Sequence, residues 1–253
     1  MSEDVAIETR GLTKDFNGFL AVKNVDLRVR LGSIHALIGP NGAGKTTCFN
    51  LITKFLTPTS GQIFYRNQEI TGAEPADLAR RGVCRSFQIS AVFPHLTVLE
   101  NVRVALQRKL GTYLHFWRSE RSLRRLNERA VELLAAVGLA SFRNRLTVEL
   151  PYGRKRALEL ATTLAMEPKV LLLDEPTAGL GQEDVRAITK LIGEVAAGRT
   201  VLMVEHNLGV VADLSQRITV LQRGEVLAEG SYQEISRNEE VRRAYLGGGG
   251  HHG

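Results

Sequence analysis

The sequence predicts an α/β fold with a parallel sheet at its core and antiparallel strands before it, and three observations lead to it. From residue 169 onward, short apolar runs alternate with segments of helical periodicity, as in parallel strands joined by crossover helices. A glycine-rich loop joins an earlier apolar run to a helix. Before both, residues 5–31 alternate apolar and polar side chains, which is typical of antiparallel strands.

The expected elements follow in chain order. Residues 5–31 and 61–65 predict a small antiparallel β subdomain, and residues 34–38 and 45–55 predict a buried strand and a helix on either side of the glycine loop. Residues 95–165 carry helical periodicity with few strand signals, so we expect an inserted helical subdomain. The later elements are strands over 169–173, 200–205, 217–222 and 225–228, and helices over 154–166, 182–196, 207–214 and near 231–245.

Length and composition predict one domain over residues 1–246, followed by a flexible Gly/His tail over 247–253. The chain has 253 residues, and its 43% of apolar residues is enough for a sizeable core. We expect no membrane span, because no run of about 20 apolar residues occurs, and no secretory signal, because the start is acidic. The two cysteines give no disulfide framework or metal spacing, and Cys48 is expected to be buried and reduced.

The glycine loop carries the clearest chemistry. Gly39-Pro40-Asn41-Gly42-Ala43-Gly44-Lys45-Thr46 fits the pattern G-x-x-x-x-G-K-[ST] without a mismatch, between a predicted strand and a predicted helix. Glycines let the backbone N–H groups turn inward toward phosphate oxygens, and the helix N-terminus adds favourable partial charge. Lys45 is expected to reach the β- and γ-phosphates, and Thr46 to bind Mg²⁺. A glycine turn that binds nothing is the alternative.

Two polar strand ends are expected near this loop. Asp174 and Glu175 follow the apolar run 170–173, and His206 follows the apolar run 200–205. Open parallel sheets place ligands at the carboxyl ends of their strands. Asp174 is therefore a candidate Mg²⁺ ligand, Glu175 a candidate base for the attacking water, and His206 a candidate donor to the γ-phosphate. The alternatives are a solvated strand end and a surface histidine.

Together these segments resemble the nucleotide-binding subunit of ABC transporters over about residues 5–246. Within that family the sequence looks most similar to the ATP-binding subunits of branched-chain amino acid importers. The resemblance implies a P-loop NTPase cassette with a mixed sheet core, an antiparallel β subdomain and an inserted α-helical subdomain, and ATP and Mg²⁺ as cofactors. The segments that carry it are Phe16-Asn17-Gly18 before Ala21-Val22, residues 38–47, Arg85-Ser86-Phe87-Gln88, Leu150-Pro151-Tyr152-Gly153-Arg154, residues 174–180, Glu205-His206 and residues 244–247.

The resemblance also implies roles for single residues. Phe16 would stack on adenine, and Gln88 would bind Mg²⁺ or the attacking water and report to a membrane partner. Glu175 would be the catalytic base and His206 a switch. Lys45 would also take part in catalysis. The residues that bind the nucleotide within one subunit would be Asn41, Gly42, Ala43, Gly44, Lys45, Thr46 and Thr47, and the metal ligands would be Thr46, Gln88 and Asp174. In a head-to-tail dimer, the nucleotide would also be contacted in trans by Pro151, Tyr152, Gly153 and Arg154.

The sequence departs from the family pattern at two places. The usual Leu-Ser-Gly-Gly-Gln segment carries Pro151, Tyr152 and Arg154 instead, so its trans hydroxyl to the γ-phosphate is lost. Proline suits the first turn of a helix, and Arg154 offers a charge in exchange. Gly181 stands where the family carries Asp, which removes a polar link across the dimer. Both departures bear on turnover more than on ATP binding.

The net charge of +6 is concentrated in one segment. Residues 108–129 hold seven Lys/Arg against two Glu, together with the only tryptophan, Trp117. A solvated helix face with a small hydrophobic cluster is one interpretation. A surface against anionic lipid headgroups or a membrane subunit is another, and nucleic-acid binding is a third. We expect no nucleic-acid partner.

The resulting hypothesis is an ATP-binding and ATP-hydrolysing subunit that powers a membrane importer, for branched-chain or related amino acids. Its implied partners are integral-membrane permease subunits, a second copy or a paralogous ATPase subunit, and, indirectly, a periplasmic solute-binding protein. Its implied place is the cytoplasmic face of the inner (plasma) membrane, as a peripheral subunit. The alternatives are a soluble ABC ATPase of DNA repair or translation, which usually carries two cassettes or a long coiled coil, and the motor of a lipid or polysaccharide exporter.

Overall fold

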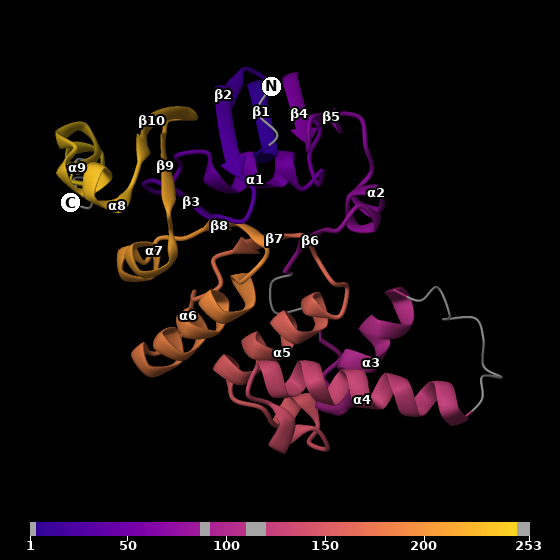
Figure 1. Cartoon of the computed structure of the whole chain (residues 1–253). Helices are drawn as coiled ribbons and strands as arrows, with labels where there is room; N and C mark the ends of the chain where they lie inside the picture. Colours follow the sequence, from indigo (N-terminus) through magenta and orange to yellow (C-terminus); the bar gives the residue numbers. More distant parts are fainter. Residues whose placement is uncertain (1–3, 87–91, 110–119, 247–253) are drawn as a thin grey trace.

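The computed structural model describes residues 4–86, 92–109 and 120–246 and contains two sheets (Figure 1). The smaller sheet is antiparallel, with the strand order β2-β1-β4-β5. It confirms the strands predicted from the alternation in residues 5–31. Its members are β1 (Val5–Phe16), β2 (Phe19–Arg30), β4 (Ser60–Tyr65) and β5 (Gln68–Glu69).

The larger sheet is mixed, as predicted, with the strand order β10-β9-β3-β8-β7-β6. Its strands run parallel from β9 to β6, and β10 pairs antiparallel with β9. The carboxyl ends of β3, β8 and β7 therefore meet at one edge, where ligands bind in sheets of this kind. The six strands are β3 (Ile34–Ile38), β6 (Val83–Arg85), β7 (Val170–Asp174), β8 (Thr200–Val204), β9 (Arg217–Gln222) and β10 (Glu225–Gly230).

Helices flank the larger sheet, and helix α1 (Lys45–Ile52) begins directly after the glycine loop. Within the described part of the chain, no helix has the length and apolar character needed to cross a bilayer. The remaining helices are α2 (Pro75–Arg80), α3 (Val98–Lys109), α4 (Glu120–Ala136), α5 (Tyr152–Leu164), α6 (Gln182–Ala196), α7 (Leu208–Leu214), α8 (Tyr232–Arg237) and α9 (Glu239–Leu246), with short 3₁₀ turns at η1 (Ala140–Phe142) and η2 (Thr147–Glu149).

Some expected boundaries were wrong. The helix expected over 45–55 ends at Ile52, because Lys54 takes a left-handed conformation with φ of 64° that a helix does not continue through. The helix expected over 154–166 begins at Tyr152 and ends at Leu164. Helix α2 and strand β6 were not predicted, since a strand of three residues is too short to show alternation. The tail over 247–253 and residues 110–119 of the basic segment lie outside the described residues, whereas residues 120–129 of that segment belong to α4.

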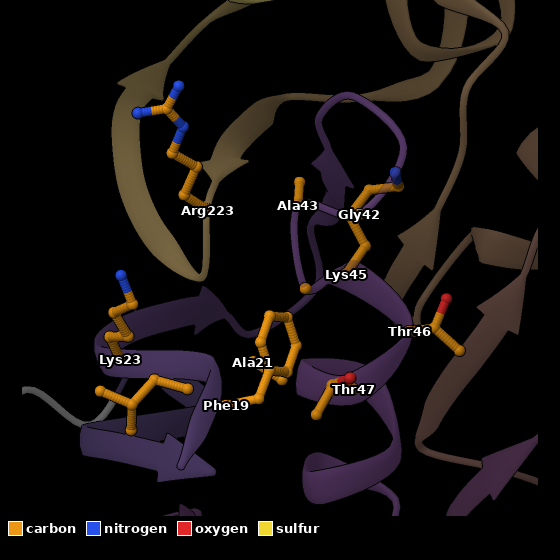
Figure 2. Close-up of a pocket in the computed structure, with 11 residues that line it drawn as sticks. Phe19, Ala21, Lys23, Gly42, Ala43, Lys45, Thr46, Thr47 and Arg223 are labelled. Carbon is orange, nitrogen blue, oxygen red and sulfur yellow. The ribbon is translucent and has the colours of Figure 1, made fainter. Parts of the chain in front are cut away.

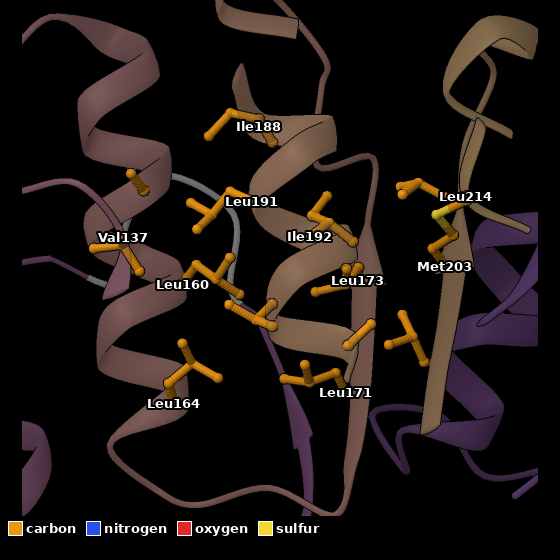
Figure 3. Packing of buried hydrophobic residues seen from close by; sticks show 14 of the residues in the cluster. Val137, Leu160, Leu164, Leu171, Leu173, Ile188, Leu191, Ile192, Met203 and Leu214 are labelled. Atoms are coloured by element: carbon orange, nitrogen blue, oxygen red, sulfur yellow. The ribbon is translucent and has the colours of Figure 1, made fainter. Parts of the chain in front are cut away.

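The core forms on both faces of the larger sheet. Successive side chains of a strand point to opposite faces, so Leu171 and Leu173 of β7 pack among the helices, whereas Leu172 packs toward α1 and the antiparallel sheet. Figure 3 shows Leu173 beside Ile192 of α6, with Leu171 further along β7 and Met203 of β8 on the other side. A strand that is buried on both faces is held rigidly, and this fixes the residues at its carboxyl end.

Candidate nucleotide-binding site

The glycine loop between β3 and α1 is held closely against its neighbours. A Cβ atom on Gly39, where φ is 151°, would lie 2.2 Å from the carbonyl oxygen of Leu221. One on Gly44, where φ is 96°, would lie 2.4 Å from the carbonyl oxygen of Ala21. Only glycine permits both the conformation and the close approach at these two positions.

Backbone hydrogen bonds anchor this loop to two other segments. The N–H of Gly224, in the turn between β9 and β10, donates to the carbonyl of Ala43 at 3.0 Å. The carbonyl of Gly224 accepts from the N–H of Lys23 in β2 at 2.7 Å. The turn between β9 and β10 therefore links the glycine loop to the antiparallel sheet.

A cavity of about 390 Å³ opens beside the loop (Figure 2). Every predicted nucleotide-binding residue from Gly42 to Thr47 lines it. Figure 2 shows Phe19 beside Thr47, with Lys23 and Arg223 nearby. The full lining is Phe19, Leu20, Ala21, Lys23, Gly42, Ala43, Gly44, Lys45, Thr46, Thr47 and Arg223.

Two predicted residues lie elsewhere, and five lining residues, among them Phe19, Lys23 and Arg223, were not predicted. Phe16 does not line this cavity; its ring lies under the Lys14 ammonium, 5.2 Å from it. Asn41 lines a second cavity of about 590 Å³, on the side of the loop that faces α9. Phe19, Lys23 and Arg223 were missed. For Phe19 there was a signal, an aromatic residue three positions after Phe16, but Arg223 is brought to the loop only by folding.

Lys45 folds back over its own loop. Its Nζ donates to the carbonyl oxygens of Gly39 at 2.8 Å and of Pro40 at 3.0 Å. Burial lowers the pKa of the Lys45 ammonium, and the negative charge of Glu175 partly opposes this shift. Lys45 and Glu175, two of the predicted catalytic residues, are far apart in sequence but close enough to influence each other.

Asp174, at the end of β7, has an arginine as its partner. Its Oδ2 accepts from Nη2 of Arg85 at 2.6 Å, and the side chains of Arg85 and Asp174 are 15% and 4% exposed. Nη1 of Arg85 donates to Oδ1 of Asn50 on α1 at 2.8 Å, and the guanidinium lies over the rings of Phe49 and Phe55. No role for Arg85 was predicted, because the pairing joins residues 89 positions apart. Gln88 lies outside the described residues.

Glu175 and His206 both lie at the same edge of the sheet. The N–H of Glu175 donates to the carbonyl of Val204 in β8 at 2.9 Å, and Glu175 takes a left-handed conformation with φ of 44°. The side chain of His206 is 59% exposed, whereas that of the preceding Glu205 is fully buried. Glu205 accepts hydrogen bonds from Thr177 and from the backbone that follows it, and it was missed because the sequence pattern indicated only the end of a strand.

The altered segment over residues 150–154 opens α5. Pro151 is the N-cap residue, and Gly153 faces α6 so closely that an added Cβ atom would lie 2.5 Å from Cγ of Asp184. The hydroxyl of Tyr152 lies 3.5 Å from the carbonyl oxygen of Ala178, in the turn after Glu175.

The guanidinium group of Arg154 packs against its own subunit. It lies 3.9 Å from the ring centroid of Phe142. Residues 151–154 do not line the cavity beside the glycine loop of the same chain. Gly181 is the N-cap residue of α6 and supplies no side-chain cap.

The donors at the sheet edge suit a hard cation. Among the described residues, no cluster of three or more His, Cys, Asp or Glu could hold a metal ion. The hydroxyl of Thr46, which is exposed at the start of α1, and the buried carboxylate of Asp174 are oxygen donors of the kind that Mg²⁺ uses together with phosphates and water. The residues present therefore fit Mg²⁺ bound with a nucleotide better than a site made by protein ligands alone.

Comparisons with known proteins agree with this geometry. The sequence model of the ABC transporter family matches residues 22–178, and that of the branched-chain amino acid ATP-binding cassette transporter matches residues 225–251. The chain is 40% identical over 248 residues to the high-affinity branched-chain amino acid transport ATP-binding protein LivG of Escherichia coli K12, with 95% of this chain and 97% of the relative covered. It is 40% identical over 251 residues to the corresponding protein BraF of Pseudomonas aeruginosa PAO1, with the same coverage.

Solved structures of ABC transporter cassettes are also similar to this chain. An ATP-binding cassette of an ABC transporter in its ADP conformation superposes with a TM-score of 0.85 at 29% identity, covering 96% of this chain and 99% of that one. A dimeric cassette bound to ADP and Pi superposes with a TM-score of 0.74 at 28% identity, covering 89% and 98%. Because one family model spans most of the chain and two relatives match it almost from end to end, this chain belongs to the ABC transporter family, as a nucleotide-binding, ATP-hydrolysing cassette.

Proposed function

We propose that this ATPase powers the import of branched-chain or related amino acids through a membrane. The observation that carries the proposal is the extent of the match to importer subunits, which runs over 95% of the chain and includes the C-terminal segment 225–251. Neither alternative function has an observation of its own in its favour. We also infer that residues 1–246 act as one cassette, with residues 95–165 as an inserted helical subdomain.

The glycine loop would hold the phosphates of ATP. Lys45 Nζ now donates to two carbonyls of its own loop, and phosphate oxygens entering the cavity are stronger acceptors because they carry charge. We infer that Lys45 turns from these carbonyls to the β- and γ-phosphates. The backbone N–H groups of residues 41–47 and the start of α1 would surround the same phosphates.

Two aromatic rings, only one of which lines the cavity, are candidates for stacking on adenine. Phe16 is the residue that the family resemblance implies, whereas Phe19 lines the cavity and is 68% exposed. Stacking on one exposed ring is worth about 1–3 kcal/mol per base. Comparing the ATP affinities of Phe16→Ala and Phe19→Ala would identify the ring that is used.

Thr46, Asp174 and Gln88 would hold Mg²⁺. When bound, the ion neutralises charge on the β- and γ-phosphate oxygens. Asp174 suits this task, since its carboxylate is held in place by Arg85 at 2.6 Å.

Hydrolysis would use the two residues at the sheet edge. Glu175 would orient or deprotonate the water that attacks the γ-phosphate, and His206 would donate a hydrogen bond to that phosphate. Both follow strands that are buried on both faces, so their positions vary little. Electrostatic preorganisation of this kind needs no rearrangement at the moment of reaction.

A second cassette would complete the site. Residues 151–154 do not line their own chain's cavity, which supports a role against the nucleotide of a partner, either a second copy or a paralogue. A related cassette bound to ADP and Pi is dimeric. The pair would be bound to integral-membrane permease subunits at the cytoplasmic face of the membrane, with a periplasmic solute-binding protein as an indirect partner.

Uptake of labelled leucine by cells that lack the native ATPase subunit tests the proposal. The wild-type chain, expressed with its permeases, should restore uptake, and Lys45→Ala and Glu175→Gln should not. Purified Lys45→Ala should bind ATP weakly by calorimetry, whereas Glu175→Gln should bind ATP and turn it over roughly 10²–10⁴-fold more slowly. Failure of the chain to co-purify with any integral-membrane protein would favour the soluble alternative, and co-purification without amino acid uptake would favour the exporter.

A further inference from the structure

A buried carboxylate lies directly before His206. The side chain of Glu205 is 0% exposed. Its Oε1 accepts from the backbone N–H of Thr177 at 3.1 Å and from the Thr177 hydroxyl. Its Oε2 accepts from the backbone N–H groups of His206 at 2.9 Å and of Asn207 at 3.1 Å. Four donors from two distant segments thus meet at one carboxylate.

This carboxylate is satisfied by hydrogen bonds. Within the described residues, no lysine or arginine forms an ion pair with Glu205, and Nδ1 of His206 lies 3.9 Å from its Oε2. A buried carboxylate is costly unless it is hydrogen-bonded, and an ionised one is an acceptor at both oxygens. A glutamine in this place has only one acceptor oxygen, so its NH₂ group would face at least one backbone N–H donor on either side.

The segments joined by Glu205 carry two of the predicted catalytic residues, Glu175 and His206. Thr177 lies two residues after Glu175, in a turn closed by the N–H of Ala178 donating to the carbonyl of Glu175 at 3.1 Å. On the far side of the same turn, the carbonyl oxygen of Ala178 lies 3.5 Å from the hydroxyl of Tyr152 at the start of α5. A shift of this turn would therefore displace Glu175 and also change the contact with Tyr152.

The other segment is equally well defined. Oε2 of Glu205 holds the N–H groups of His206 and Asn207, and the Asn207 side chain in turn caps α7 by accepting from the N–H of Gly209 at 3.0 Å. These hydrogen bonds restrain the backbone that carries the exposed imidazole of His206.

We propose that Glu205 is a positioning residue that holds His206 and the turn after Glu175 in one fixed arrangement, so that the two side chains meet the γ-phosphate together. The inference rests on the proposed function, in which Glu175 and His206 act on ATP. The side chain of Glu205 is fully buried, so it acts by keeping two segments in register.

Glu205→Gln is the first test, with nucleotide affinity and turnover measured separately. Turnover should fall by about 10- to 100-fold, the loss that a misplaced reacting group causes, while ATP affinity by calorimetry stays near that of the wild type because the glycine loop is untouched. Glu8→Gln is the matched control, since Glu8 is a buried carboxylate of β1 that pairs with Arg10 and Arg28 outside the site. It should leave turnover unchanged.

Thr177→Val is the second test, and it decides the matter if Glu205→Gln does not fold. It removes only the hydroxyl donor to Oε1 and keeps the shape of the side chain. By backbone NMR, Thr177→Val should shift the amide signal of His206, 29 positions away in sequence. A role of the Thr177 hydroxyl confined to its own turn would leave that signal unchanged. Turnover should fall, and Glu205→Gln should add less on the Thr177→Val background than alone, because contacting residues couple.

The outcomes separate this inference from the function on which it rests. If Glu175→Gln and His206→Ala both keep wild-type turnover, the assigned hydrolytic site is wrong. If those variants lose turnover but Glu205→Gln or Thr177→Val keeps both wild-type turnover and an unshifted His206 amide signal, the positioning role of Glu205 is overturned.

Discussion

Replacing Arg85 by leucine should destabilise the nucleotide-free protein strongly. The change leaves the Asp174 carboxylate, 4% exposed, without its ion-pair partner at 2.6 Å, and removes the donor to Asn50 and the cation over two phenylalanine rings. Leaving one member of a buried pair uncompensated costs about 3–5 kcal/mol. For a domain of this size, about 2–4 °C is lost per kcal/mol, so the melting temperature should fall by roughly 6–20 °C.

Chemical denaturation of a double-mutant cycle measures the effect. Asp174→Asn added to Arg85→Leu should recover part of the lost free energy of unfolding, because no buried charge then remains unpaired. Arg85→Lys should fall between wild type and leucine, since an ammonium can pair with Asp174 but lacks the planar fork that also reaches Asn50. All variants are compared without nucleotide and Mg²⁺. Arg85→Leu within about 1 kcal/mol of the wild type, or strict additivity in the cycle, would refute this reasoning.

Three further predictions concern the loop and its surroundings. Gly44→Ala should displace the loop and abolish ATP binding by calorimetry, because its Cβ atom would lie 2.4 Å from the carbonyl oxygen of Ala21; a wild-type affinity would contradict the assigned site. Arg154→Ala should leave the ATP affinity of the single subunit intact but weaken ATP-driven dimerisation by about 1.5–3 kcal/mol, as for a hydrogen bond to a charged group. Phe142→Leu removes only the stacking partner of Arg154, so it should leave dimerisation unchanged. Sedimentation with ATP distinguishes the two variants. Burial raises the pKa of the Cys48 thiol to about 12, so iodoacetamide at pH 8 should modify it only after unfolding; rapid labelling of the native protein, seen by mass spectrometry, would show that Cys48 is accessible.

Local patterns determined much of the site. The strand before the glycine loop and helix α6 have the predicted bounds, Ile34–Ile38 and Gln182–Ala196, because hydrophobic periodicity and turn chemistry depend on near neighbours in the chain. The same local reasoning placed Asp174 at a strand end, and the glycine pattern identified the residues that line the cavity from Gly42 to Thr47.

Only the tertiary structure decided which distant residues meet. The order of strands puts β8 between β3 and β7, and this brings Glu175 to the carbonyl of Val204 and Thr177 to Glu205. The sheet likewise carries Arg85 to Asp174, and the turn between β9 and β10 carries Arg223 to the glycine loop. Such contacts depend on strand order and on packing across the core, and neither has a period that can be seen along the sequence.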